Sequence, residues 1–374
     1  MTRNFPPLVG GMERLNRKLL EALQPAWRMA LCGPDGCEGF VAPSVLVRQS
    51  HVKSLPLFLT HALWQALALA LQYKPQVVVA GSGLTAPIAW LVARCCGAKA
   101  IVYLHGLDVI APNFIYQALW LPFIRRCDLA LVNSLNTAEL AKGARIVPER
   151  LRVLNPGTDI PDLDAAAGTK FRRSNALGQR PVLLSVGRLT QRKGLAPFVR
   201  HAMPAILARH PDALLLIIGA EARQALHAQA GSQQERILAA AREVGVESSL
   251  RFLGNCDEDT LGAAYQAANV HVFPVLDQPG DVEGFGMVAL EAAAHGLPTV
   301  AFNVGGVPDA VLDGQTGDLI GSGDYVSMSD AIARRLGQTH DPTTVVTCRN
   351  FAAGKSWSIF GERLRQMLTE RMVD

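Results

Sequence analysis

The chain has 374 residues, 49% of them hydrophobic and 18% charged, so it can bury the cores of two domains and is neither a disordered nor a fibrous protein. Its formal net charge of +4 at pH 7 argues against a dedicated nucleic-acid binder but permits attraction to phosphorylated ligands. Seven scattered cysteines form neither a disulfide framework nor a CxxC metal pair, and the first residues lack the apolar core of a signal peptide, so we expect a cytoplasmic protein.

Two glycines precede a helical pattern near the start of the chain. In "PPLVGGMERL", Gly10 and Gly11 follow the expected end of a first strand. A turn without side chains lets the backbone approach a phosphate or an acceptor closely. The alternative is that the pair forms only a turn, as Gly-Gly before a helix often does.

Short apolar runs then alternate with helical stretches through the first half of the chain. Each run ends in small or polar residues, as in "RMALCG", "QVVVAG", "AIVYLHG" and "LALVNS". This alternation is typical of a parallel α/β domain. Residues 55–71 form a longer apolar stretch that His61 and Gln65 interrupt, so we expect a buried or interfacial helix rather than a transmembrane span.

His105 ends the third of these strands, in "IVYLHGLD". A lone histidine in such a place is usually structural. The carboxyl end of a parallel strand is also where an α/β sheet binds ligands, so the imidazole could instead hydrogen-bond a sugar hydroxyl or an acceptor. In that case Asp108 is positioned to orient it.

Composition divides the chain into parts. Residues 157–180 are rich in Pro, Gly, Asp and Arg, which indicates a linker after an N-terminal domain of residues 1–156. Apolar strands resume in "PVLLSVGR", "ALLLIIGA", "LRFLGN", "VHVFPV" and "PTVAFN", so residues 181–354 are expected to form a second doubly wound domain. Residues 355–374 predict an amphipathic helix that packs back on the N-terminal domain. Two such domains would hold a ligand in the cleft between them.

The first strand of the second domain leads into a basic loop, "SVGRLTQRKG". Arg188 and Lys193 follow the strand end five residues apart. A guanidinium and an ammonium at this place could neutralise two phosphate groups, most of all when negative charge grows on a departing diphosphate. The alternative is a basic loop whose charged ends are solvated.

The stretch "DVEGFGMVALEAAAHGLPTV" contains two carboxylates eight positions apart. Glu283 is expected in a loop, and Glu291 two turns into a helix that starts near Gly286. The amides of Gly286, Met287 and Val288 would favour an anion, ideally a diphosphate. Both carboxylates then suit sugar hydroxyls on either side of it, which indicates a nucleotide sugar. The alternative is that both glutamates are simply solvated.

Several common motifs are absent. The sequence contains no GxGxxG, GxxxxGK[ST] or HExxH motif, which weakens dehydrogenase, P-loop and zinc-protease interpretations. Likewise, no Asp-x-Asp element suggests a diphosphate held through a metal. Arg188 and Lys193 would therefore have to supply the positive charge.

Taken together, these motifs resemble the retaining glycosyltransferases of family 4. The resemblance rests on Glu283 and Glu291 as a Glu-x7-Glu element, on "GRLTQRKG", on "NPGTD" and on the early "GG". It runs over nearly the whole chain and implies the α/β GT-B fold, in which two doubly wound Rossmann-like domains face each other across a cleft. The catalytic residues that it implies are His105, Arg188, Lys193 and Glu283.

The family also implies a role for each donor contact. Arg188 and Lys193 would hold the diphosphate, Glu291 the ribose, and Glu283 and His105 the transferred sugar. The base would pack near "RFLGN". The expected donor-binding residues are Gly10, Gly11, Arg188, Lys193, Leu253, Glu283, Phe285, Gly286, Met287, Val288 and Glu291.

Within the family, "DVEG" and "FPPLVGGMERL" look most like bacterial GDP-mannose-dependent mannosyltransferases acting on phosphatidylinositol mannosides. We therefore expect a retaining, metal-independent hexosyltransferase without a cofactor, which moves mannose from GDP-mannose to a glycan or lipid-linked acceptor of the cell envelope. The expected partners are the donor, the acceptor and, at the inner face of the cytoplasmic membrane, anionic lipid.

Two alternatives stay open. One is a UDP-hexose-dependent member of the same family, because the motifs do not decide the base or the sugar. The other is a non-catalytic, membrane-associated assembly protein with a degenerate donor site. The second is motivated by the start of the chain, where only "MTRN" precedes "FPP", so we expect the first strand of the family to be truncated.

Overall fold

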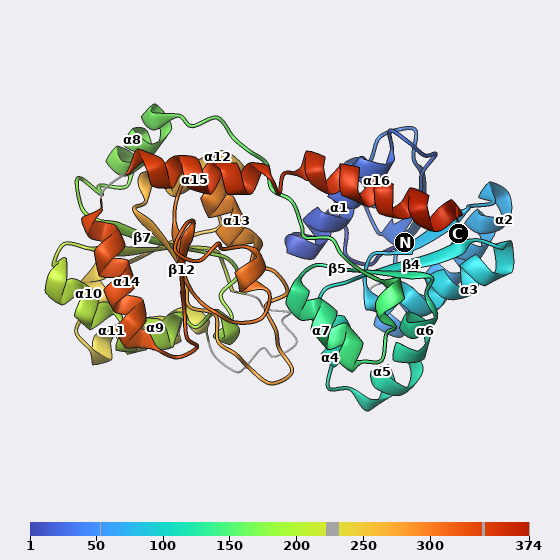
Figure 1. The fold of residues 1–374 in the computed structure, drawn as a ribbon, viewed down its shortest axis with the longest axis horizontal. Helices are drawn as coiled ribbons and strands as arrows, with labels where there is room; N and C mark the ends of the chain where they lie inside the picture. The colour runs from blue at the N-terminus through green and yellow to red at the C-terminus, as the bar shows by residue number, and fades with distance from the viewer. Residues whose placement is uncertain (53, 222–231, 339–340, 374) are drawn as a thin grey trace. The chain divides into compact units, whose positions relative to one another are not determined.

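The structure is a computed structural model that describes residues 1–52, 54–221, 232–338 and 341–373 (Figure 1). Its contacts divide the chain into two compact units. Unit 1 comprises residues 1–157, 280–285 and 357–374, and unit 2 comprises residues 158–279 and 286–356. Both are built from parallel strands and helices, which confirms the predicted α/β class.

Unit 1 contains strands that pair in parallel with helical connections. Its helices and strands in chain order are α1 (Gly11–Leu23), β1 (Ala30–Pro34), β2 (Leu46–Ser50), α2 (Leu55–Tyr73), β3 (Val77–Ala80), α3 (Ala86–Cys96), β4 (Lys99–Leu104), α4 (Leu107–Ile110), α5 (Phe114–Leu119), α6 (Leu121–Arg126), β5 (Leu129–Val132), α7 (Leu135–Gly143), β6 (Leu151–Val153) and α16 (Trp357–Val373). The sheet order is β3-β4-β5-β6, and β1 pairs with β2 in a separate ribbon.

The four-stranded sheet of unit 1 is buried on both faces. Along β4, Ile101 and Tyr103 point to one face and pack with leucines of α1 and with α16. Val102 and Leu104 point to the other face, toward α3 and α6. Because side chains alternate along a strand, one continuous apolar run supplies both cores.

The strand that we expected to end at Gly10 is not formed. Residues 1–9 contain no strand, and Pro6 and Pro7 have no N–H to donate to a ladder. Only the first two residues link neighbouring strands: the Met1 amino group donates to Val79 O at 2.7 Å, and Thr2 N donates to Cys32 O at 3.1 Å. A cavity of about 470 Å³ lies beside them, lined mainly by apolar residues of α1, β1 and β3.

Helix α2 is the predicted apolar stretch. Its buried residues, Phe58, Ala62, Ala66, Leu69 and Ala70, face β1, β2 and α3. Among the residues that the structure describes, α2 alone is long and apolar enough to cross a membrane by length and composition.

Unit 2 contains one six-stranded parallel sheet. Its helices and strands in chain order are α8 (Ala165–Ser174), β7 (Val182–Val186), α9 (Leu195–His201), α10 (Met203–Arg209), β8 (Leu214–Ile218), α11 (Gln233–Glu243), β9 (Leu250–Gly254), α12 (Glu258–Ala267), β10 (Val270–Phe273), α13 (Met287–Ala294), β11 (Thr299–Phe302), β12 (Gly317–Ile320), α14 (Tyr325–Gly337) and α15 (Pro342–Ala353). Helices α8, α12, α13 and α15 lie on one side of the sheet, and α9, α10, α11 and α14 on the other (Figure 1).

The order of the strands in unit 2 indicates where this sheet would bind a ligand. The order is β12-β11-β10-β7-β8-β9, so the chain runs outward from β7 to β9 and then returns to the other side of β7 as β10. The connections that follow β7 and β10 therefore leave in opposite directions. In an open α/β sheet, the crevice at the carboxyl ends of two such strands is where ligands bind. The loop after β7 carries Arg188 and Lys193, and the loop after β10 leads to α13.

Candidate active site

The loops after β7 and β10 pack tightly against each other. Gly194 has a φ of +70°, and a Cβ at this position would overlap the carbonyl oxygen of Pro274. Leu276 N donates to Arg192 O at 2.8 Å. A glycine is needed because it alone allows both the left-handed conformation and this close approach. The basic loop is thereby held against the segment that follows β10.

Lys193 lies over the ring of Phe273, the last residue of β10. Its Nζ is 4.5 Å from the ring centroid, which is a favourable cation–π distance. On the same ring, a Cβ built at Gly286 would lie 3.1 Å from Phe273 Cε1. One aromatic side chain therefore separates the Lys193 ammonium from the amino terminus of α13. Arg188, closer to the end of β7, is exposed to solvent.

Helix α13 begins as the sequence predicted. Gly286 is its N-cap, with a φ of +90° and no side chain to cap the helix. A helix whose first amides are not satisfied by a cap side chain presents N–H groups and a positive dipole end to an anion. A side-chain cation, Lys193, and the amino terminus of a helix, at Gly286, thus both lie at the Phe273 ring.

Glu291 lies on α13 and is half-buried. Its Oε2 is 3.3 Å from the hydroxyl of Tyr265 on α12, and its backbone oxygen is 2.8 Å from Nδ1 of His295. Burial lowers the pKa of His295, which favours the neutral ring, and Nδ1 then carries the proton that is donated to the carbonyl. Tyr265, which is only 1% exposed, was not predicted from the sequence to be a site residue.

A buried histidine also lies in unit 2, on the strand that ends at Phe273. His271 is fully buried on β10, its Nδ1 is 3.1 Å from Thr299 Oγ1, and its Nε2 has no hydrogen-bond partner among the described residues. Burial, and secondarily the positive charge of Lys193, lowers the pKa of His271 to about 3. The ring is therefore neutral near pH 7. This residue too was missed from the sequence, where "VHVFPV" indicates only a buried strand.

In unit 1, His105 follows β4 at the predicted strand end. Its Nε2 is 2.9 Å from Gly81 O, so Nε2 carries a proton and Nδ1 can accept a hydrogen bond. The expectation that Asp108 orients the imidazole is wrong in its detail. Asp108 Oδ2 instead accepts from the backbone N–H of His105, two residues before α4, at 2.9 Å.

The segment that carries Glu283 groups with unit 1. It is a loop, as expected, and Gly284 lies against β4 and β5: a Cβ at this position would be 2.8 Å from His105 O and 2.5 Å from Asn133 Nδ2. Phe285, which ends the segment, is 2% exposed. The structure thus brings the Glu283 segment to the strand end where His105 lies.

Three other predicted donor residues lie in different surroundings. Gly10 is the N-cap of α1 and Gly11 its first residue, and the Glu13 carboxylate folds back over Gly10. Leu253 lies on β9, the edge strand of the unit 2 sheet, where it packs against the core. These residues remain predictions as donor contacts.

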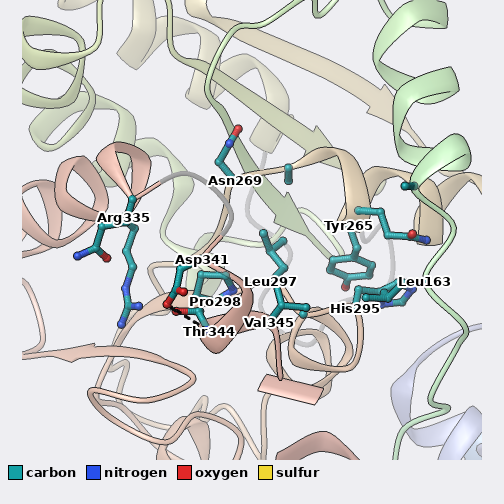
Figure 2. A pocket seen from close by; sticks show the side chains of 15 residues that line it. Leu163, Tyr265, Asn269, His295, Leu297, Pro298, Arg335, Asp341, Thr344 and Val345 are labelled. Atoms are coloured by element: carbon teal, nitrogen blue, oxygen red, sulfur yellow. Dashed lines mark hydrogen bonds between the residues drawn. The ribbon is translucent and has the colours of Figure 1, made fainter. Parts of the chain in front are cut away.

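Figure 2 shows the side chains that line a cavity of about 240 Å³ in unit 2. Asn269 and Pro298, which line it, come directly before β10 and β11, so the cavity is at the amino ends of the strands. None of the predicted site residues lines it. Tyr265 and His295, however, form part of its wall and also contact Glu291.

Comparison with known proteins identifies the family to which the chain belongs. A family model described as Glycosyltransferase Family 4 matches residues 9–161, and one described as Glycosyl transferases group 1 matches residues 168–343. A GDP-mannose-dependent alpha-(1-6)-phosphatidylinositol monomannoside mannosyltransferase of Mycolicibacterium smegmatis is 32% identical over 304 residues, which cover 77% of this chain and 75% of that protein. The chain belongs to the family 4, group 1 glycosyltransferases.

Other relatives of this glycosyltransferase differ in their named activity. A D-inositol 3-phosphate glycosyltransferase of Corynebacterium diphtheriae is 31% identical over 252 residues, 65% of this chain and 56% of that protein. Among solved structures, Anabaena Alr3699/HepE in complex with UDP superimposes with a TM-score of 0.81 at 17% identity, covering 99% of this chain and 98% of that one.

A sucrose-phosphate synthase from Thermosynechococcus elongatus superimposes with a TM-score of 0.77 at 23% identity, covering 97% of this chain and 94% of that one. These structures show that the fold is GT-B, which confirms the predicted fold class. Membership of the family makes the protein a glycosyltransferase.

Proposed function

We propose that this glycosyltransferase transfers mannose from GDP-mannose to a hydroxyl of a glycan or lipid-linked acceptor in cell-envelope synthesis, with retention at the anomeric carbon and without a metal. The observation that carries the proposal is the arrangement around Phe273, where the Lys193 ammonium and the amino terminus of α13 flank one ring at the β7/β10 crevice. The choice of mannose is supported by the mycobacterial relatives, which are named GDP-mannose-dependent.

Each residue has a role in this proposal. Lys193 and Arg188 bind the diphosphate, the amides that open α13 contribute further donors, and Glu291 accepts from the ribose hydroxyls. Glu283 and His105 contact the transferred sugar. Because Nε2 of His105 is engaged with Gly81 O, its Nδ1 is the ring atom that can accept from a sugar hydroxyl.

The bond changes follow from a front-face reaction. The acceptor oxygen bonds to the anomeric carbon on the face that the diphosphate leaves, and the bond between that carbon and the phosphate oxygen breaks. The departing phosphate oxygen takes the acceptor's proton. Preorganised positive charge at the leaving group is then the main catalytic effect, and water is kept out of the site to limit hydrolysis.

A donor screen tests this function. The purified protein is titrated with GDP and UDP by calorimetry, and release of nucleoside diphosphate is followed with GDP-mannose first and UDP-sugars next. We expect GDP to bind more tightly than UDP, and GDP-mannose to be the donor that turns over. Tighter binding of UDP would replace the proposal with a UDP-hexose-dependent transferase, and binding of neither would favour a non-catalytic assembly protein.

We also propose that α2 makes peripheral contact with an anionic membrane. Leu57, Trp64 and Leu71 on this helix are 60%, 73% and 72% exposed, and such apolar residues favour the interface of a bilayer. Flotation with vesicles that contain phosphatidylglycerol should carry the protein upward. The Trp64→Ser variant should reduce the floated fraction, and a wild-type protein that stays at the bottom would exclude the contact.

A further inference from the structure

The carboxylate of Glu291 has a buried neighbour on the next helix. The Tyr265 hydroxyl is 3.3 Å from Glu291 Oε2 and 3.4 Å from Val288 O. A hydroxyl has one proton to donate, and an ionised carboxylate is a stronger acceptor than a backbone carbonyl. Tyr265 therefore has a partner that fixes its hydroxyl, and Glu291 has a donor that fixes one of its oxygens.

The Tyr265 ring is itself held in place. It is 1% exposed and stacks on the ring of His295, with centroids 4.9 Å apart and an interplanar angle of 22°. His295 in turn donates from Nδ1 to the backbone oxygen of Glu291 at 2.8 Å. The Tyr265 and His271 rings form an edge-type pair with centroids 6.3 Å apart. These contacts hold the phenol with its hydroxyl toward α13.

Resting on the proposed function, we infer that Tyr265 is a positioning residue that holds the Glu291 carboxylate in the orientation that reads the ribose. A carboxylate offers about four acceptor positions, so one hydrogen bond from Tyr265 leaves enough for two ribose hydroxyls. Loss of the phenol removes one hydrogen bond that orders the glutamate side chain, so nucleotide binding must supply more of this ordering and becomes weaker.

The test compares nucleotides with and without ribose hydroxyls. Wild type and Tyr265→Phe are titrated with GDP and 2′,3′-dideoxy-GDP, and with UDP and its dideoxy analogue, so that the result does not depend on the base. We expect Tyr265→Phe to weaken binding of the ribose nucleotide about three- to tenfold, which is the range of a typical net hydrogen bond. Binding of the dideoxy nucleotide should change by less than about twofold, because those hydroxyls are missing.

Two further variants separate positioning from a structural effect. In a double-mutant cycle, Tyr265→Phe should have no added effect on ribose preference in the Glu291→Ala background. The matched control is Tyr325→Phe. Tyr325 is half-buried on α14 and packs on Phe302, and its replacement should leave the preference for ribose nucleotides unchanged. Phenylalanine fills the volume of tyrosine, and thermal melts report whether each variant folds.

The outcomes distinguish this inference from the proposed function. If the wild type prefers ribose nucleotides and Glu291→Ala loses that preference while Tyr265→Phe keeps it, the inference is wrong and the donor site stands. Equal weakening of ribose and dideoxy nucleotides by Tyr265→Phe would also overturn it. A wild-type protein that binds no nucleoside diphosphate would overturn both proposals.

Discussion

Replacing Lys193 by alanine is expected to lower kcat of sugar transfer on the order of a hundredfold or more, as removal of one preorganised charge at a leaving group typically does. The reason is that negative charge on the departing diphosphate grows between the bound donor and the transition state, so Lys193 stabilises the transition state more than the ground state. KM should change less than kcat, because the ground-state donor carries less charge at the scissile oxygen. Steady-state release of nucleoside diphosphate from the preferred donor measures both constants.

Control variants show whether the loss of activity is specific to the positive charge at position 193. Lys193→Arg keeps the charge but changes its shape, and should retain part of the activity. Lys170→Ala removes an exposed lysine from α8 in the same unit and should leave turnover unchanged. Arg188→Ala should lower kcat in the same direction as Lys193→Ala. Normal turnover by a correctly folded Lys193→Ala protein would remove this residue from the catalytic set.

Acid should destabilise the protein through His271. The pKa of this histidine is about 3 when folded and, on exposure, returns to its ordinary value of 6.5. Above pH 6.5 both states carry the neutral ring, so the group adds no pH dependence. As the pH falls below 6.5, the unfolded chain takes up a proton that the native chain does not, and the free energy of unfolding falls by about 1.4 kcal/mol per pH unit. The accumulated loss at pH 5 is about 2 kcal/mol.

Urea unfolding at pH 7 and pH 5 measures this effect. His271→Asn keeps a polar group near Thr299 but cannot titrate, so its stability should depend less on pH than that of the wild type, by about 2 kcal/mol over this interval. The exposed His201→Asn variant serves as the control and should keep the wild-type pH dependence. If His271→Asn and wild type lose the same stability between the two pH values, the ring is not held neutral in the native state.

The strands that the sequence predicted share a simple property. Runs such as Val182–Val186 and Leu214–Ile218 are buried at every position, and all their residues except Ser185 are apolar, because a parallel strand covered by helices is buried on both faces. The missed strands lack this property. β2 is partly exposed, β6 has only three residues, and β12 begins with Gly-Asp, so each owes its conformation to the neighbouring strand with which it pairs.

The sequence also predicted some residues of the candidate site and missed others. Arg188, Lys193 and Gly286 were found because basic and small residues after an apolar run indicate the ligand end of an α/β sheet. Phe273, Tyr265 and His271 were not found, because an aromatic or a histidine in an apolar run reads as core. The wrong detail at Asp108 has a related cause: a carboxylate three residues after a histidine can bind either the ring or the backbone, and the turn into α4 decides between them.

The sequence by itself determined the fold class, most of the strands and the chemical types of the predicted donor contacts. It could do so because burial periodicity and glycine placement are local properties of the chain. Only the tertiary structure decided which of these residues meet. The chain returns to the far side of β7, so β10 pairs with β7. This pairing brings Lys193, from the loop after β7, and Gly286, at the start of α13, to the ring of Phe273. Likewise, the packing of α12 beside α13 brings Tyr265 to Glu291, a contact between residues 26 positions apart that no local pattern encodes.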